Sequence, residues 1–147
     1  MGHVVLLGDS VFDNGAYVGR GEPDVARQLH DRLPAGWGAT LAAVDGAVTG
    51  DVPRQLGRVP PGATHLVVSV GGNDALRRQD VLGASARSVA DALLALGEVR
   101  DGFARGYRAC WTRCSPAGCR PRSARSTTRA SRRDSAWRRQ GWLCSTT

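Results

Sequence analysis

Apolar residues cluster in three short runs along the first half of the chain. Residues 3–8 (HVVLLG) are apolar and rich in valine and leucine until a glycine ends the run, which predicts a buried strand. Residues 39–50 predict a second strand that runs into a glycine-containing loop. Residues 64–74 (THLVVSVGGND) predict a third strand, which ends in two glycines and two polar residues. Three strands are therefore expected, each followed by a polar loop.

Segments with helical periodicity lie between and after these runs. In residues 22–33 a valine or leucine recurs every four residues, and a proline and an aspartate suit the first turn of a helix. Residues 51–56 predict a short helix, and residues 84–109 predict a long one. The long helix keeps its large apolar side chains on one face, namely Val89, Leu93, Leu96, Phe103 and Tyr107.

The predicted elements alternate as strand, helix, strand, helix, strand, helix. Such alternation is typical of an α/β fold with a parallel sheet and helices on both faces. Ligands in such folds bind beyond the carboxyl ends of the strands. Because the polar loops at residues 8–14, 45–51 and 71–74 all follow predicted strands, we expect them to form one site.

Composition divides the 147-residue chain at residue 109. Residues 1–109 hold 11 arginines and 12 acidic residues, a net charge of −1, whereas residues 110–147 hold nine arginines and one acid, a net charge of +8. All four cysteines lie in the second part, where Leu143 is the one residue from the set Leu, Ile, Val, Met and Phe. We therefore expect one folded portion over residues 1–109 and a disordered tail over residues 110–147 that supplies no inner strand.

The three loops contain the groups that an acyl-transfer site needs. Ser10 directly follows the first strand, where its hydroxyl could act as a nucleophile. Gly50 has no side chain, so its backbone N–H can approach a substrate closely. Asn73 offers a neutral side-chain donor. With the Ser10 N–H, these two donors predict an oxyanion hole.

Three aspartates flank these groups. Short carboxylates in loops usually accept hydrogen bonds from nearby backbone N–H groups and hold the turn. We expect this structural role, rather than that of a triad acid, for Asp9, Asp13 and Asp74.

The motifs around these residues resemble those of the GDSL, or SGNH, family of serine esterases and lipases. GDSVFDNG is similar to the nucleophile block of the family, VDGAVTGDV to its second block and VVSVGGND to its third. The resemblance covers residues 3 to about 109 and implies a flavodoxin-like three-layer α/β sandwich whose C-terminal part is incomplete. It implies hydrolysis of a small-molecule carboxylic ester through a Ser10 acyl-enzyme, without a metal or organic cofactor.

The general base that the resemblance implies is absent. In the family it belongs to a C-terminal Asp-x-x-His motif, whose histidine takes the serine proton, and no histidine follows His65 in this chain. His65 opens a predicted strand and His3 precedes one, so both are expected at the opposite edge of the sheet, and His30 is expected on a helix surface. Activity of this chain is therefore expected to be impaired.

The tail admits several interpretations. A zinc site at Cys110, Cys114 and Cys119 would have a spacing that fits no common ligand pattern. A disulfide framework fits poorly with a chain that lacks a secretory signal. A basic, tryptophan-containing arm could contact phosphates and stack on bases. A non-catalytic binding protein with such a nucleic-acid-binding tail stays open as the alternative function.

The tail also has the composition of GC-rich DNA read out of frame. The chain uses arginine and no lysine, which is typical of GC-rich coding DNA. Residues 110–119, written as GC-rich codons and shifted by two bases, are compatible with LDAVLARGLP, which continues the apolar face of the preceding helix. We therefore favour a frameshift hypothesis, which the coding DNA around codons 105–112 would test.

Neither a signal peptide nor a membrane span is indicated by the sequence. The apolar run at residues 4–7 is far shorter than the apolar region of a signal peptide. No segment approaches the roughly 20 apolar residues that a spanning helix needs. We expect a cytoplasmic protein with no membrane partner.

Overall fold

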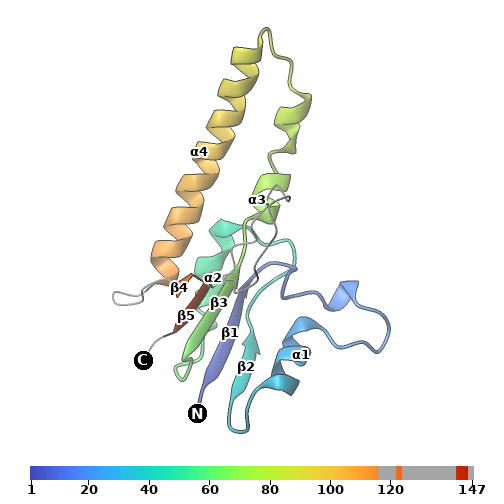
Figure 1. Cartoon of the computed structure of the whole chain (residues 1–147), viewed down its shortest axis with the longest axis vertical. Helices are drawn as coiled ribbons and strands as arrows, with labels where there is room; N and C mark the ends of the chain where they lie inside the picture. Colours follow the sequence, from blue (N-terminus) through green and yellow to red (C-terminus); the bar gives the residue numbers. More distant parts are fainter. Residues whose placement is uncertain (116–121, 124–141, 146–147) are drawn as a thin grey trace, which may run out of the picture.

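A small sheet forms the centre of the computed structural model, which describes residues 1–115, 122–123 and 142–145. Its strand order is β2-β1-β3-β5-β4 (Figure 1). As the apolar runs predict, three of the strands are parallel: β1 (His3–Gly8), β2 (Gly38–Leu41) and β3 (His65–Ser69). The chain is therefore a mixed α/β protein.

Central β1 is buried on both faces. Each of its side chains from Val4 to Leu7 is at most 7% exposed. Because successive side chains of a strand point to opposite faces, an uninterrupted apolar run is what a strand covered on both sides requires. On one face, Val5 and Leu7 pack with Leu56, which belongs to α2 (Val52–Leu56).

The helices between the strands lie close to their predicted positions. α1 (Val25–Arg32) lies alongside β2 (Figure 1). It begins later than predicted because Asp24 caps it, accepting a hydrogen bond from the Arg27 N–H at 2.7 Å. A short 3₁₀ helix, η2 (Thr49–Asp51), leads directly into α2.

The direction of the chain across the sheet changes at β1. The chain passes from β1 to β2 on one side and then returns to β3 on the other side of β1. With the usual right-handed crossovers, α1 and α2 then lie on opposite faces of the sheet. A ligand site is favoured where the direction changes, beyond the carboxyl ends of β1 and β3.

Three short helices form where the sequence predicted loops. They are η1 (Gly15–Tyr17), α3 (Gly72–Leu76) and η3 (Gln79–Gly83). α3 matters most to the site because it begins inside the third polar loop. Gly71, just before it, has a φ of 124°, and the Phe103 ring lies 3.1 Å from the position that a Cβ would occupy there.

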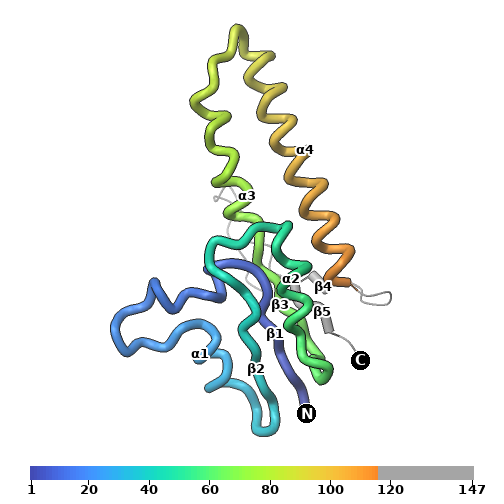
Figure 2. The backbone as a smooth tube through the Cα atoms, turned by 180° about the vertical axis from the view of Figure 1, so that it is seen from behind, coloured from blue at the N-terminus to red at the C-terminus, as the bar shows by residue number. Residues whose placement is uncertain are grey.

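The long helix α4 (Val89–Cys114) begins and ends about five residues later than predicted. Near its end, Cys110 and Cys114 are at most 5% exposed and pack against Val52 of α2. Its first half projects with α3 and η3 past the ends of the strands (Figure 2), and we call residues 72–99 the arm. The predicted apolar face is exposed there, with Val89 78% and Leu93 64% exposed. The periodicity thus predicted the helix but not what covers it.

Two further strands come from residues 110–147, the tail that was not expected to supply an inner strand. β5 (Trp142–Ser145) pairs antiparallel with β3, and β4 (Arg122–Ser123) pairs with β5. The prediction that the tail supplies no inner strand is therefore wrong. The outer edge of β3 presents backbone N–H and C=O groups that can pair with any extended segment, whatever its side chains. Residues 110–114 were also expected to be disordered, but they form the end of α4. The other residues of the predicted disordered tail, 116–121, 124–141 and 146–147, lie outside the described residues.

Gly8 ends β1 in a conformation that only glycine adopts readily. Its φ is 128°, a region that is strained for residues with a Cβ. A Cβ at this position would also overlap the backbone carbonyl oxygen of Ser69 in β3. The Asp9 N–H donates to that same oxygen at 3.0 Å. Close approach of the two backbones therefore requires glycine.

We predict that Gly8→Ala lowers the free energy of unfolding by about 4 kcal/mol or more, because strain and steric overlap add. The control is Gly62→Ala, since Gly62 lies in a turn with open space around its Cβ position, and we expect a change within about 0.5 kcal/mol. Urea unfolding followed by circular dichroism measures both variants. Equal stabilities of the two would contradict this account of the β1 terminus.

Candidate active site

The loops that follow β1 and β2 are joined by hydrogen bonds. The Gly8 carbonyl accepts a hydrogen bond from the Val44 N–H at 3.0 Å. The Asp13 carboxylate accepts one from the Asp45 N–H at 2.9 Å. The first polar loop is therefore fastened to the second at two points.

The second loop is fastened to the third in the same way. Both carboxylate oxygens of Asp74 accept hydrogen bonds from Thr49, one from its N–H at 2.9 Å and one from its hydroxyl at 2.6 Å. The Asn73 side-chain amide donates to the Ala47 carbonyl at 3.0 Å. All three polar loops therefore meet at the carboxyl edge of the sheet, as the predicted strand order implied.

The aspartates that flank the site accept hydrogen bonds from backbone N–H groups, as expected. The buried Asp9 carboxylate accepts a hydrogen bond from the Val11 N–H at 3.1 Å. Asp13 and Asp74 accept from backbone N–H groups of the neighbouring loop. Each carboxylate thus fixes the shape of a loop, which confirms the structural role predicted for these residues.

Ser10 is half-buried at the start of the turn that follows β1. The Phe12 and Asp13 N–H groups both donate to the Asp9 carbonyl, at 3.1 Å each, and so close this turn around Ser10. Within the part of the chain that the structure describes, the Ser10 hydroxyl makes no hydrogen bond. The hydroxyl is therefore available to a ligand.

Gly50 is exposed and is the second residue of η2. The first N–H groups of a helix have no partner within it, so the Gly50 N–H can donate outward. Nothing lies within 4 Å of the position that a Cβ would take. The described neighbours therefore do not require glycine here, and an open space adjoins its backbone.

Asn73 is the second residue of α3 and its side chain is half-buried. An asparagine amide carries two N–H donors. One of them holds the Ala47 carbonyl of the second loop. The other donates to no described residue, so Asn73 can bridge the loops and still donate to a ligand.

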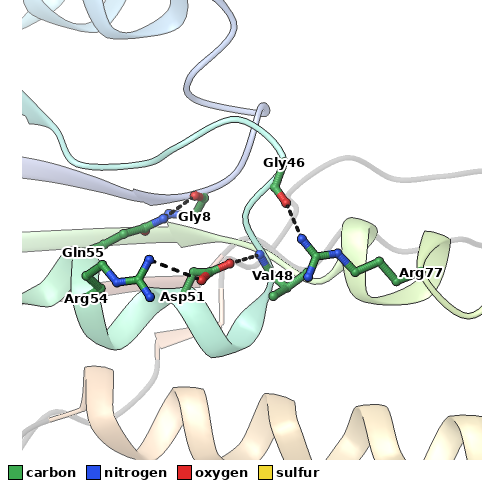
Figure 3. Close-up of polar contacts among 7 residues, drawn as sticks. All are labelled: Gly8, Gly46, Val48, Asp51, Arg54, Gln55 and Arg77. Carbon is green, nitrogen blue, oxygen red and sulfur yellow. Dashed lines mark hydrogen bonds and ion pairs between the residues drawn. The ribbon is translucent and has the colours of Figure 1, made fainter.

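Gln55 fastens the end of β1 and was not anticipated from the sequence. Its side chain is only 2% exposed, accepts from the Gly8 N–H at 2.7 Å and donates to the Gly8 carbonyl at 2.8 Å (Figure 3). The amide thus satisfies both backbone groups of Gly8, as a neighbouring strand would. A glutamine in a five-residue helix gives no sequence signal for this role.

The three histidines lie far from Ser10. His3 and His65 are the first residues of β1 and β3, whereas Ser10 follows the last residue of β1. At about 3.3 Å per residue, the ends of β1 are roughly 16 Å apart. The His3 ring bonds Thr40, the His65 ring bonds Thr64, and His30 is exposed on α1. None of them hydrogen-bonds the Ser10 hydroxyl in this structure.

A cleft of about 510 Å³ lies between the second and third loops and α4. Its wall includes Val48 and Asp74 from the loops. Apolar side chains of α4 line it, namely Leu96, Val99 and Phe103, and so do three arginines, Arg77, Arg78 and Arg100. The cleft therefore offers an apolar surface next to residues that carry the polar site.

Two tyrosines and one cysteine have shifted pKa values. The Tyr17 hydroxyl donates to the Asp45 carboxylate at 2.7 Å, and this hydrogen bond raises the pKa of Tyr17. Burial raises the pKa of Tyr107. A hydrogen bond from Cys114 lowers the pKa of Cys110. All three groups lie outside the set formed by Ser10, Gly50 and Asn73.

Among residues 1–115, no group of three or more His, Cys, Asp or Glu side chains is placed to hold a metal ion. The side chains of Cys119 and Cys144, like most of the basic tail considered for nucleic-acid binding, lie outside the described residues. None of the described helices has the length and apolar character needed to cross a membrane.

We predict that Gln55→Leu lowers the free energy of unfolding by about 1–3 kcal/mol, because it leaves the buried Gly8 N–H without a partner. Gln79→Leu is the control, since Gln79 is exposed on η3, and it should change stability by less than about 0.5 kcal/mol. Chemical unfolding of both variants checks the difference. A Gln55→Leu protein as stable as the control would show that the contact with Gly8 contributes nothing.

Comparison with known proteins adds no further information about this site. No family model, curated protein or solved structure matches the chain. Any function therefore has to be inferred from the residues and contacts described above.

Proposed function

We propose that the chain is a serine ester hydrolase of the SGNH type, with a flavodoxin-like fold and Ser10 as its nucleophile. One observation supports this most. The Ser10 hydroxyl, which makes no hydrogen bond to a described residue, lies on a loop that is hydrogen-bonded to the loop of Gly50. The loop of Gly50 is in turn hydrogen-bonded to the loop of Asn73. A nucleophile with two donor-bearing loops beside it is the arrangement that acyl transfer needs.

The chemistry proceeds through an acyl-enzyme. The Ser10 oxygen attacks the ester carbonyl carbon, and the carbonyl oxygen becomes an oxyanion. Collapse of this intermediate breaks the bond to the alcohol oxygen, and the alcohol leaves with a proton. Water then attacks the acyl-enzyme, which releases the carboxylic acid and restores the Ser10 hydroxyl. A base that takes the serine proton and returns it to the leaving alcohol speeds each step.

Three donors would stabilise the oxyanion. The Ser10 and Gly50 N–H groups supply two, and the second N–H of the Asn73 amide supplies the third. The bond from Asn73 to the Ala47 carbonyl orients this amide before substrate binds. Donors that are already oriented cost no reorganisation during the reaction, which is why one of them typically contributes about 10²–10³ in rate.

The apolar cleft between the loops and α4 suits the acyl part of an ester. Val48 and Asp74 join it to the polar loops, and Phe103 of α4 also lines it. Its volume of about 510 Å³ falls in the range of small-molecule sites. We therefore propose esters with an apolar acyl chain as the substrate class.

No histidine of this chain lies at the carboxyl edge of the sheet. We propose that turnover is impaired for this reason, and that the frameshift hypothesis accounts for the missing base. Oxyanion stabilisation and substrate binding alone can still exceed the uncatalysed reaction by about 10³–10⁴. Weak, serine-dependent hydrolysis is the expected behaviour.

We predict that the chain hydrolyses p-nitrophenyl butyrate slowly and that Ser10→Ala abolishes this rate. Ser85→Ala, in the exposed arm, should retain it. Exogenous imidazole should raise the rate of the parent chain more than that of Ser10→Ala, because it supplies the missing base. A rate that is the same with and without Ser10 would refute the proposed nucleophile. Fast Ser10-dependent turnover without imidazole would refute the proposal that this chain lacks a general base.

We predict that Asn73→Ala lowers the serine-dependent rate about 10²–10³-fold, because it removes an oxyanion donor. Asn14→Ala is the matched control, since Asn14 also makes one side-chain to backbone hydrogen bond, accepting from the Val25 N–H at 2.9 Å. It should change the rate by less than about threefold, because it lies outside the donor set. Steady-state kinetics with thermal unfolding of both variants separates a loss of chemistry from a loss of folding.

A further inference from the structure

A second cleft, of about 300 Å³, lies beside the loop from Val44 to Asp51. Three arginines line it. Arg54 belongs to α2, Arg58 follows that helix, and Arg77 caps the end of α3. Figure 3 shows the Arg54 and Arg77 side chains extending toward this loop from opposite sides. Positive groups thus flank the cleft on two sides.

The guanidinium groups are only weakly engaged. Arg54 is 3.9 Å from the Asp51 carboxylate, and its side chain is 81% exposed. Arg77 donates to the Gly46 carbonyl over 3.4 Å, close to the limit for a hydrogen bond (Figure 3). The Arg58 guanidinium group has no ion pair or hydrogen bond with any residue among those described. Exposed pairs of this kind contribute little, so most of the arginine donors are available.

The two carboxylates on the cleft wall are already engaged by other donors. Asp51 accepts a hydrogen bond from the Val48 N–H at 3.1 Å and so closes the turn of η2. Asp45 accepts from the Tyr17 hydroxyl at 2.7 Å. The wall holds three cations and two anions, and its unused groups are mainly N–H donors. This combination favours an anionic ligand.

We propose that this cleft binds a phosphate group, either as free phosphate or as part of a small phosphate monoester. A carboxylate has two oxygens, which a single guanidinium can satisfy in bidentate fashion. A phosphate group carries three terminal oxygens and a charge near −2 at neutral pH, which matches guanidinium groups that approach from two sides. The ester chemistry proposed for Ser10 plays no part in this binding.

A two-dimensional NMR titration of the full chain tests the proposal, with inorganic phosphate, glycerol 3-phosphate and acetate as probes at constant ionic strength. We expect saturable shifts of the amides of residues 44–47 with one or both phosphate compounds, which also distinguishes free phosphate from a monoester. Arg58→Gln and Arg77→Gln should each weaken binding about tenfold or more, because each removes a charge-assisted donor. Arg20→Gln, which changes an exposed arginine between η1 and α1, should change the affinity by less than about twofold.

Two further observations make this test decisive. Thermal unfolding of each variant shows whether a loss of binding comes from a loss of folding. Arg58→Lys keeps the positive charge but loses the planar set of guanidinium N–H donors, so it should bind phosphate with intermediate strength. Acetate that binds as tightly as phosphate would overturn the proposal. It would also be overturned by the absence of saturable shifts with both phosphate compounds, or by equal losses in Arg20→Gln and Arg58→Gln.

Discussion

The carboxyl end of β1 depends on one close approach between backbones. At Gly8 the chain of β1 comes so near to the Ser69 carbonyl of β3 that no side chain fits between them. Asp9 then donates to that carbonyl, and the Gln55 amide occupies the other side of Gly8 with two hydrogen bonds. Ser10 follows within two residues, so its position derives from this junction of two strands and a helix.

Two aspartates that have no part in the proposed chemistry join the loops of the candidate site. Asp13 joins the first loop to the second and Asp74 joins the second to the third. Asn73 both bridges loops and presents a donor. Because ionised carboxylates make stronger hydrogen bonds than neutral groups do, the two aspartates can fix loops that contain several glycines and would otherwise be costly to order.

The sequence was most informative where side-chain burial decides the structure. The sequence predicts a strand at Val4 to Leu7 because a strand covered on both faces requires an uninterrupted apolar run. The end of each apolar run also located the loop that follows the strand. Gln55 could not be predicted, since its role depends on a backbone distant in sequence. Nor could β5, because backbone pairing leaves no apolar pattern. On α4, periodicity shows that Val89 and Leu93 share a face, but it carries no information about what covers that face.

The exposed arm determines where local unfolding of the molecule begins. Local stability follows the density of buried contacts, and segments with few of them unfold at a free energy well below that of the whole. The arm carries Leu82 and Val89 with most of their surface in solvent, whereas β1 is almost fully covered. Amide hydrogens of residues 76–96 should therefore exchange in an early subglobal step, while those at the Gly8 junction should exchange only when the sheet itself comes apart.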